Sequence, residues 1–119
     1  MSNVTESLER LMELAGARSA ALVDSSTGMV LGHAGSDSDL EITAAANTEV
    51  VRAQLRSIGT LGSGDAIDDI IITLSTQYDI IRPLAVNPSI FLYLAMDKNK
   101  SNLALARYQA TECEQGLEL

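Results

Sequence analysis

The chain has 119 residues, of which 46% are hydrophobic and 20% are charged. These values are ordinary for a globular protein, and we expect residues 1–119 to form a single domain. Sixteen acidic and eight basic residues give a formal net charge of −8, and aromatic residues make up only 3% of the chain. Such a chain repels phosphate groups and lacks aromatic platforms for bases, so nucleic acid and anionic membranes are not expected partners.

The N-terminal sequence shows no targeting pattern. It begins Met1, Ser2, Asn3, Val4, with neither a basic leader nor an apolar segment behind it. No apolar run approaches the ~18 residues that a membrane span needs. The single cysteine, Cys113, cannot form an internal disulfide. We therefore expect a cytoplasmic protein without membrane insertion.

The first third of the chain predicts a helix and a β-hairpin. Asn3 and Glu6 have the spacing of a capping box, and apolar residues then recur at helical intervals before Gly16. This pattern predicts a helix of about three turns. Residues 20–23 and 29–31 are apolar and flank a stretch of turn-forming residues, which predicts two paired strands.

A long helix is predicted over residues 39–58. Ser38 and Glu41 form a second candidate capping box, and Gly59, Gly62 and Gly64 are expected to end the helix. One apolar stripe is expected to face the core: Leu40, Ala44, Asn47, Val51, Leu55 and Ile58. A second stripe lies on a neighbouring flank: Ile42, Ala46, Val50 and Ala53. Deep packing in a small core and helix-on-helix packing in a dimer both account for this second stripe.

Three short strands and a final helix complete the pattern. The strands are predicted at residues 70–74, 78–84 and 89–96, with Pro83 ending the second of them and Pro88 in the following loop. The last strand is continuously apolar, which indicates a central position in the sheet. A helical pattern then begins at Asn102. The predicted fold is an α+β, αβα sandwich of order α-β-β-α-β-β-β-α, with a five-stranded antiparallel sheet between helices.

The first of these three strands is unusual because it begins with consecutive isoleucines. Ile70, Ile71 and Ile72 do not alternate with polar residues, which indicates burial on both faces of the sheet. At a sheet edge such a strand would be a template for aggregation, and pairing it across a two-fold axis would remove that edge. We therefore predict an isologous dimer. The preceding Asp68 and Asp69 either solvate the start of this strand or orient a partner at the dimer seam.

No catalytic, cofactor-binding or metal-binding site is predicted. The glycine-rich residues 59–65 follow a helix and lead into a strand, which is the reverse of the order in a phosphate-binding loop. The residue types of a hydrolase triad are present: Ser25 or Ser36, His33 and Asp37. However, no nucleophile-elbow sequence surrounds either serine. The loop aspartates match no calcium-loop spacing: Asp24, Asp37 and Asp39. We therefore expect a protein that is not an enzyme.

Three segments resemble the roadblock family, which is related to dynein light chains of the roadblock type. They are residues 21–28 (Ala-Leu-Val-Asp-Ser-Ser-Thr-Gly), 80–84 (Ile-Ile-Arg-Pro-Leu) and 102–107 (Asn-Leu-Ala-Leu-Ala-Arg). The resemblance spans roughly residues 7–110 and is to bacterial or archaeal members. It implies a profilin-like and longin-like sandwich that dimerises through its third strand and second helix. Several members of this family bind or regulate Ras-like small GTPases.

The resemblance also implies site residues. The dimer seam would consist of Ile42, Ala46, Ala53, Ile70, Ile71, Ile72, Thr73 and Leu74. Partner contacts would come from Glu49, Arg52 and Arg56. The implied function is a non-enzymatic homodimeric adaptor that activates or scaffolds a Ras-like GTPase in signalling or polarity; a heterodimer with another roadblock protein remains open. The alternative is a small-molecule-sensing module of the same fold, with a cavity near Asn47 or Tyr93.

Overall fold

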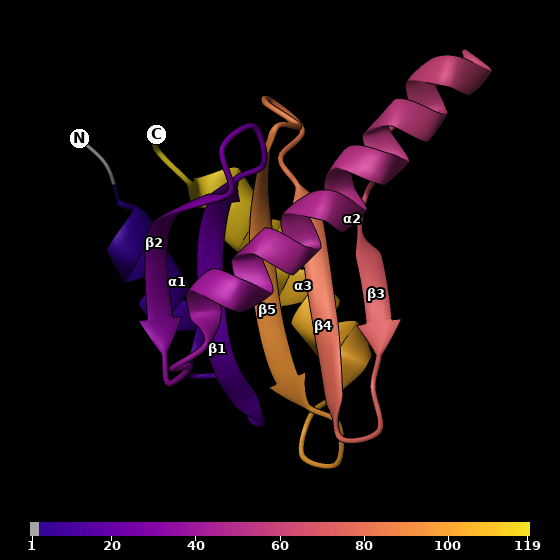
Figure 1. The fold of residues 1–119 in the computed structure, drawn as a ribbon. Helices are drawn as coiled ribbons and strands as arrows, with labels where there is room; N and C mark the ends of the chain where they lie inside the picture. Colours follow the sequence, from indigo (N-terminus) through magenta and orange to yellow (C-terminus); the bar gives the residue numbers. More distant parts are fainter. Residues whose placement is uncertain (1–2) are drawn as a thin grey trace.

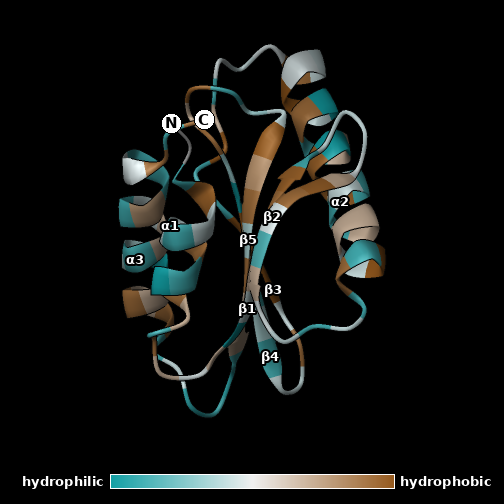
Figure 2. Cartoon of the chain, turned by 90° about the vertical axis from the view of Figure 1, so that its left-hand side faces the viewer, coloured by the Kyte–Doolittle hydropathy of each residue, from teal (hydrophilic) through white to brown (hydrophobic). Residues whose placement is uncertain are grey.

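The computed structural model describes residues 3–119 as an antiparallel sheet between two helical layers (Figures 1 and 2). The elements in chain order are α1 (Val4–Leu11), β1 (Ala17–Asp24), β2 (Met29–Gly35), α2 (Leu40–Leu61), β3 (Ile70–Thr73), β4 (Gln77–Pro83), β5 (Ile90–Asp97) and α3 (Leu103–Gly116). This order and the five-stranded antiparallel sheet confirm the predicted fold. No helix of residues 3–119 combines the length and the apolarity that crossing a membrane requires.

The strands lie side by side in the order β2-β1-β5-β4-β3. β5 pairs with β1 on one side and β4 on the other, so its predicted central position is confirmed. Its continuous apolar sequence follows from that position, because helices cover both faces of a central strand. The two edges of the sheet are β2 and β3.

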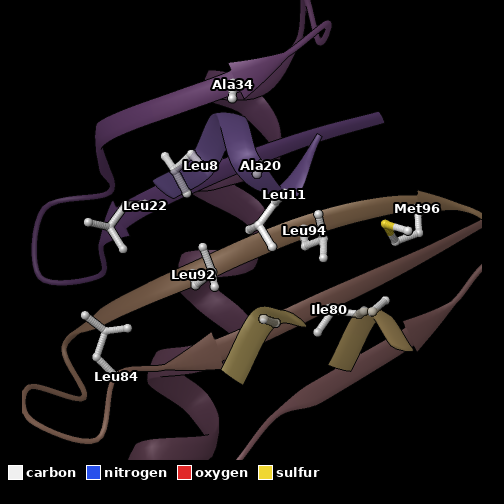
Figure 3. Packing of buried hydrophobic residues seen from close by; sticks show 12 residues of the cluster. Leu8, Leu11, Ala20, Leu22, Ala34, Ile80, Leu84, Leu92, Leu94 and Met96 are labelled. Carbon is white, nitrogen blue, oxygen red and sulfur yellow. The ribbon is translucent and has the colours of Figure 1, made fainter. Parts of the chain in front are cut away.

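Side-chain alternation along the strands divides the core into two layers. The layer against α1 and α3 contains Leu22, Leu92 and Leu94, which point from the sheet toward the helices (Figure 3). The layer against α2 contains Val23, Phe91 and Tyr93, which alternate with the first set. Burying an aromatic or leucine side chain contributes roughly 1.5–3 kcal/mol, so these two layers supply much of the driving force for folding. In Figure 2, α1 and α3 lie on one side of the sheet and α2 on the other.

The first helix is shorter than predicted, because α1 ends at Leu11. The predicted capping box is also absent, since the Asn3 side chain makes no cap hydrogen bond. Its Nδ2 donates to the Gly116 carbonyl oxygen at 2.7 Å, and its Oδ1 accepts from the backbone N–H of Glu118 at 2.8 Å. Asn3 therefore ties the start of the chain to its C-terminal end.

The second helix is longer than predicted. α2 continues through Gly59 and ends at Gly62, which has a left-handed φ of 61° and donates its N–H to the Ile58 carbonyl at 3.1 Å. Glycine within a helix is tolerated at a cost of about 1 kcal/mol, whereas the left-handed stop favours glycine strongly. The second capping box is absent as well: Asp39 is the N-cap residue, and its side chain makes no cap hydrogen bond.

The last helix begins as predicted. Asn102 is its N-cap residue, and the side-chain Oδ1 accepts the N–H of Leu105 at 3.0 Å. Pro83 is the final residue of β4, as predicted, and Pro88 lies in the loop before β5. β1 and β2 are longer than predicted, because the polar and small residues at their ends pair as well as the apolar ones.

Candidate interaction surface

β3 is an edge strand that pairs only with β4. Leu74 donates its N–H to the Gln77 carbonyl at 2.8 Å, just after the end of β3. Because hydrogen bonding alternates along an antiparallel strand, the backbone groups of Ile71 and Thr73 point away from β4. The free edge of the sheet therefore presents backbone donors and acceptors that have no partner among residues 3–119.

The isoleucines of β3 are half-buried, so the prediction of burial on both faces is only partly right. Ile70 and Ile72 pack against the α2 layer, and Ile71 lies opposite Ile80 of the other layer. Both faces are apolar as predicted, but the edge position leaves each side chain partly open to solvent. Thr73 and Leu74 are exposed.

The other edge strand, β2, contains a β-bulge, which β3 lacks. The pairing of β1 with β2 shifts between Leu22 and Val23, which leaves Leu31 as the extra residue of a β-bulge. Bulges twist an edge and discourage further strand pairing. β3 reads Ile-Ile-Ile-Thr and contains no bulge, proline or charge. Of the two edges, β3 is the one suited to accept another strand.

The second apolar stripe of α2 is not covered within the described chain. The Ile42 side chain is 72% exposed, Ala46 and Ala53 are exposed, and Val50 is half-buried. The core-facing stripe behaves as predicted at its centre, where Ala44, Asn47 and Val51 are buried. Deep packing in the protein's own core therefore does not account for the second stripe.

The structure does not gather all the predicted seam residues in one place. α2 crosses the sheet obliquely and extends beyond it past β3 (Figure 1). Ile42 lies in the first turn of α2 and lines a cavity with Val30 and His33 of β2, at the opposite edge of the sheet from β3. Ala53 lies in the half of the helix that crosses toward β3.

The three predicted partner-binding residues form an exposed polar arc on α2. Glu49, Arg52 and Arg56 are exposed, and their spacing places them on one side of the helix. None of them forms a salt bridge within residues 3–119. Two unpaired arginines on an otherwise acidic chain are available for carboxylates of another molecule.

A network of ion pairs behind β3 was not predicted. Asp69 accepts hydrogen bonds from Nε and Nη2 of Arg107 at 2.8 and 3.3 Å and lies 3.9 Å from Nη1 of Arg82. Glu114 accepts from the Arg82 Nε at 2.5 Å and from the backbone N–H of Ala85 at 2.6 Å. The network joins α3 to β4 and to the start of β3. Asp69 therefore has a positioning role within the chain, and the single arginine in the apolar segment 80–84 was the signal for it.

No hydrogen bond joins the residues of the candidate triad to one another within residues 3–119: Ser25, Ser36, His33 and Asp37. Ser25 lies in the turn of the β1–β2 hairpin and donates its hydroxyl to the Ser89 carbonyl at 2.6 Å, while His33 pairs with Ala21 farther along the strands. Asp37 accepts the backbone N–H of Asp39, which is a turn role. No cluster of three or more possible metal ligands occurs in residues 3–119. Burial raises the pKa of the Cys113 thiol to about 11, so it is uncharged at neutral pH.

Polar side chains are buried between α2 and the sheet. The Asn47 Nδ2 and Thr48 Oγ1 atoms are buried without a hydrogen-bond partner among residues 3–119. Nearby on β5, the Tyr93 hydroxyl donates to the Asp79 carboxylate at 3.2 Å, and burial followed by the Asp79 charge raises the pKa of Tyr93. An open cavity of about 340 Å³ lies over Tyr93 and Asp79.

No family model and no curated protein matches this sequence. Solved structures do match. A roadblock/LC7 domain from Streptomyces avermitilis superposes with a TM-score of 0.76 at 15% identity, covering 94% of this chain and 89% of that one. MglB from Myxococcus xanthus gives a TM-score of 0.81 at 18% identity, with the same coverage of each chain.

This protein has the roadblock fold. A further structure, MglB in a tetrameric arrangement, gives a TM-score of 0.77 at 19% identity over 92% of this chain and 81% of that chain. At identities this low, these superpositions establish the shared fold alone, which the sequence resemblance implied. The activity has to be argued from the surfaces of this chain.

Proposed function

We propose that this protein is a non-enzymatic homodimeric adaptor that regulates a small Ras-like GTPase in signalling or polarity. The observation that carries the proposal is the unprotected β3 edge, which lies beside the half of α2 that contains Ala53. The similarity to MglB structures supports it, because the roadblock resemblance implies GTPase regulation.

The proposed dimer pairs β3 with β3 of a second copy. Ile71 and Thr73 supply the outward backbone groups, and the exposed flank of α2 around Ala46 and Ala53 allows close helix approach. Ile70, Ile72 and Leu74 gain further burial at this seam. Ile42, at the far end of α2, contributes only if the second copy reaches across the helix. A different roadblock chain in place of the second copy would make the dimer heteromeric.

The proposed GTPase contact uses the polar arc of α2. Two paired chains bring together two copies of Glu49, Arg52 and Arg56, forming a composite surface that one chain lacks. Such a regulator changes the GTPase only through different affinities for its conformational states. It therefore regulates the GTPase if it prefers one nucleotide state, and it is a passive scaffold if it prefers neither.

Charge reversal on α2 tests this contact. The double variant Arg52→Glu/Arg56→Glu is expected to weaken binding to the Ras-like GTPase encoded nearest this gene by roughly tenfold or more, because two charge pairs become repulsive. Isothermal titration with the GDP-bound and GTP-analogue-bound GTPase gives both affinity and state preference. Arg10→Glu on α1, on the other side of the sheet, is the matched control. Equal affinity for wild type and double variant would refute the contact.

A second candidate function is small-molecule sensing. It is favoured by the unpartnered Asn47 Nδ2 and Thr48 Oγ1, since buried polar atoms usually have a partner. A metabolite panel tested by thermal shift would reveal a ligand as a concentration-dependent rise in Tm. An Asn47→Leu variant that kept such a rise would place the ligand elsewhere.

A further inference from the structure

We propose that a groove under the far end of α2 binds a segment of another protein, in which a large aliphatic side chain is flanked by arginine or lysine. The groove has a volume of about 240 Å³. Its apolar lining comes from α2, from the segment before β3 and from the loops around the end of β4: Leu55, Ile58, Ile67, Pro83, Leu84 and Pro88. None of these residues belongs to the polar arc or to β3, so this proposal does not rest on the GTPase role.

The groove lies between the last turns of α2, the segment that leads from this helix to β3, and the loop that follows β4. The helix extends beyond β3 (Figure 1), and the nearest strands to its backbone are β1 and β2 at its other end. Leu55 and Ile58 face the sheet in the last turns but are only half-buried. Apolar surface also continues beyond the groove, since Leu61 is 74% exposed and Val86 is 89% exposed. An aliphatic anchor from a partner would complete this burial.

The charged residues at the rim of the groove favour an occupant that is positively charged. Asp65 and Asp68 are exposed, and neither forms a salt bridge within residues 3–119. The one basic residue in the lining, Arg82, is already paired with Glu114. The groove is therefore apolar inside with two free carboxylates at its rim, which complements an aliphatic side chain next to a cation.

Nuclear magnetic resonance with two synthetic peptides tests the proposal. The probes are acetyl-Gly-Arg-Leu-Leu-Arg-Gly-amide and the same peptide with glutamate in place of both arginines. The arginine peptide is expected to shift the methyl signals of Leu55, Ile58, Ile67 and Leu84 and to bind at least about threefold more tightly than the glutamate peptide. The Asp65→Lys/Asp68→Lys variant changes only exposed residues and should reverse this preference.

A pair of apolar variants locates the binding. Ile58→Arg is expected to abolish the shifts, while Ile42→Arg at the other end of α2 leaves them unchanged. No saturable shift in millimolar peptide, equal affinity for the two peptides, or shifts outside the groove would overturn the proposal. In a Thr73→Pro background, which blocks pairing through β3, movement of the groove signals on dilution of the protein alone would show that a second copy occupies the groove, and would overturn the proposal as well.

Discussion

Gly35 illustrates how a single backbone position constrains the hairpin. It has a left-handed φ of 85°, and a Cβ there would lie 2.8 Å from both the Met12 Sδ and the Ser19 Cα and would also meet the Arg18 carbonyl oxygen. Two of these three contacts are with backbone, which cannot move aside easily. Only glycine fits where β2 ends beside β1.

Gly35→Ala is therefore expected to lower the free energy of unfolding by about 2–4 kcal/mol, from backbone strain and overpacking. Gly59→Ala is the matched control, because a Cβ there meets no atom within 4 Å and Gly59 lies inside α2. That variant should raise the free energy of unfolding by about 0.5–1 kcal/mol. Urea denaturation measures both. Equal effects of the two substitutions would contradict the account of Gly35.

Tyr93 links stability to alkaline pH. Burial and the nearby Asp79 charge raise its pKa above the usual value near 10, so the folded state holds the phenol proton more tightly than the unfolded state does. The resulting stability is fully present below about pH 10 and is lost as pH rises further. Cys113 acts in the same direction, so the measurement belongs in a Cys113→Ala background.

In that background, unfolding free energy measured between pH 8 and 11.5 should fall more steeply for Tyr93 than for Tyr93→Phe. Tyr108→Phe is the control: the Glu112 carboxylate raises the pKa of Tyr108, but both residues are exposed, so solvent screens this interaction and the substitution should change the curve little. Parallel curves for Tyr93 and Tyr93→Phe would show that the buried phenol does not control the alkaline loss of stability.

Residue-level prediction succeeded where one local interaction decides the structure. Asn102 caps α3 by accepting the N–H of Leu105, three residues along the chain. Asn3 fits the same rule by type and spacing, yet its side chain binds the C-terminal end of the chain, more than a hundred residues away. A capping box is a local sequence pattern, so it carries no information on a competing hydrogen-bond partner at the other end of the chain.

At the scale of elements, the ion-pair network fixes α3 against the sheet. Glu114→Ala removes acceptors for the Arg82 Nε and the Ala85 N–H and leaves a half-buried arginine without its closest partner. We expect the free energy of unfolding to fall by about 1–3 kcal/mol. Glu112→Ala, an exposed residue on the same helix, should leave it nearly unchanged. Chemical denaturation of both variants checks this, and equal stabilities would mean that the network is not stabilising.

Most elements were predictable because their apolar periodicity is strong. The order of helices and strands follows from it, and the central place of β5 follows from its continuously apolar sequence. The edge position of β3 was harder to predict, since Ile70, Ile71 and Ile72 have the sequence of a buried strand. Burial of a strand depends on how many neighbours it has, which is a property of sheet topology. The groove beside the end of α2 could not be predicted either, because it forms where segments far apart in the sequence meet.

At the scale of the whole molecule, the β3 edge and the exposed flank of α2 around Ala46 and Ala53 are both uncovered within residues 3–119. A monomer with a net charge of −8 resists non-specific association, yet this strand edge carries no charge of its own. The proposed two-fold dimer would cover the β3 edge and the part of this flank that contains Ala53. It would also create the composite α2 surface on which the proposed GTPase contact depends.

The most direct test is the light-scattering mass of the wild-type protein and the Thr73→Pro variant across a dilution series. Thr73 is exposed and its N–H points away from β4, so proline there blocks the free edge without removing a hydrogen bond of the β3–β4 pair. We predict about twice 12.6 kDa for wild type and 12.6 kDa for the variant, with unchanged circular dichroism. A monomeric wild type at every concentration, or a Thr73→Pro variant that stays dimeric, would contradict pairing through β3.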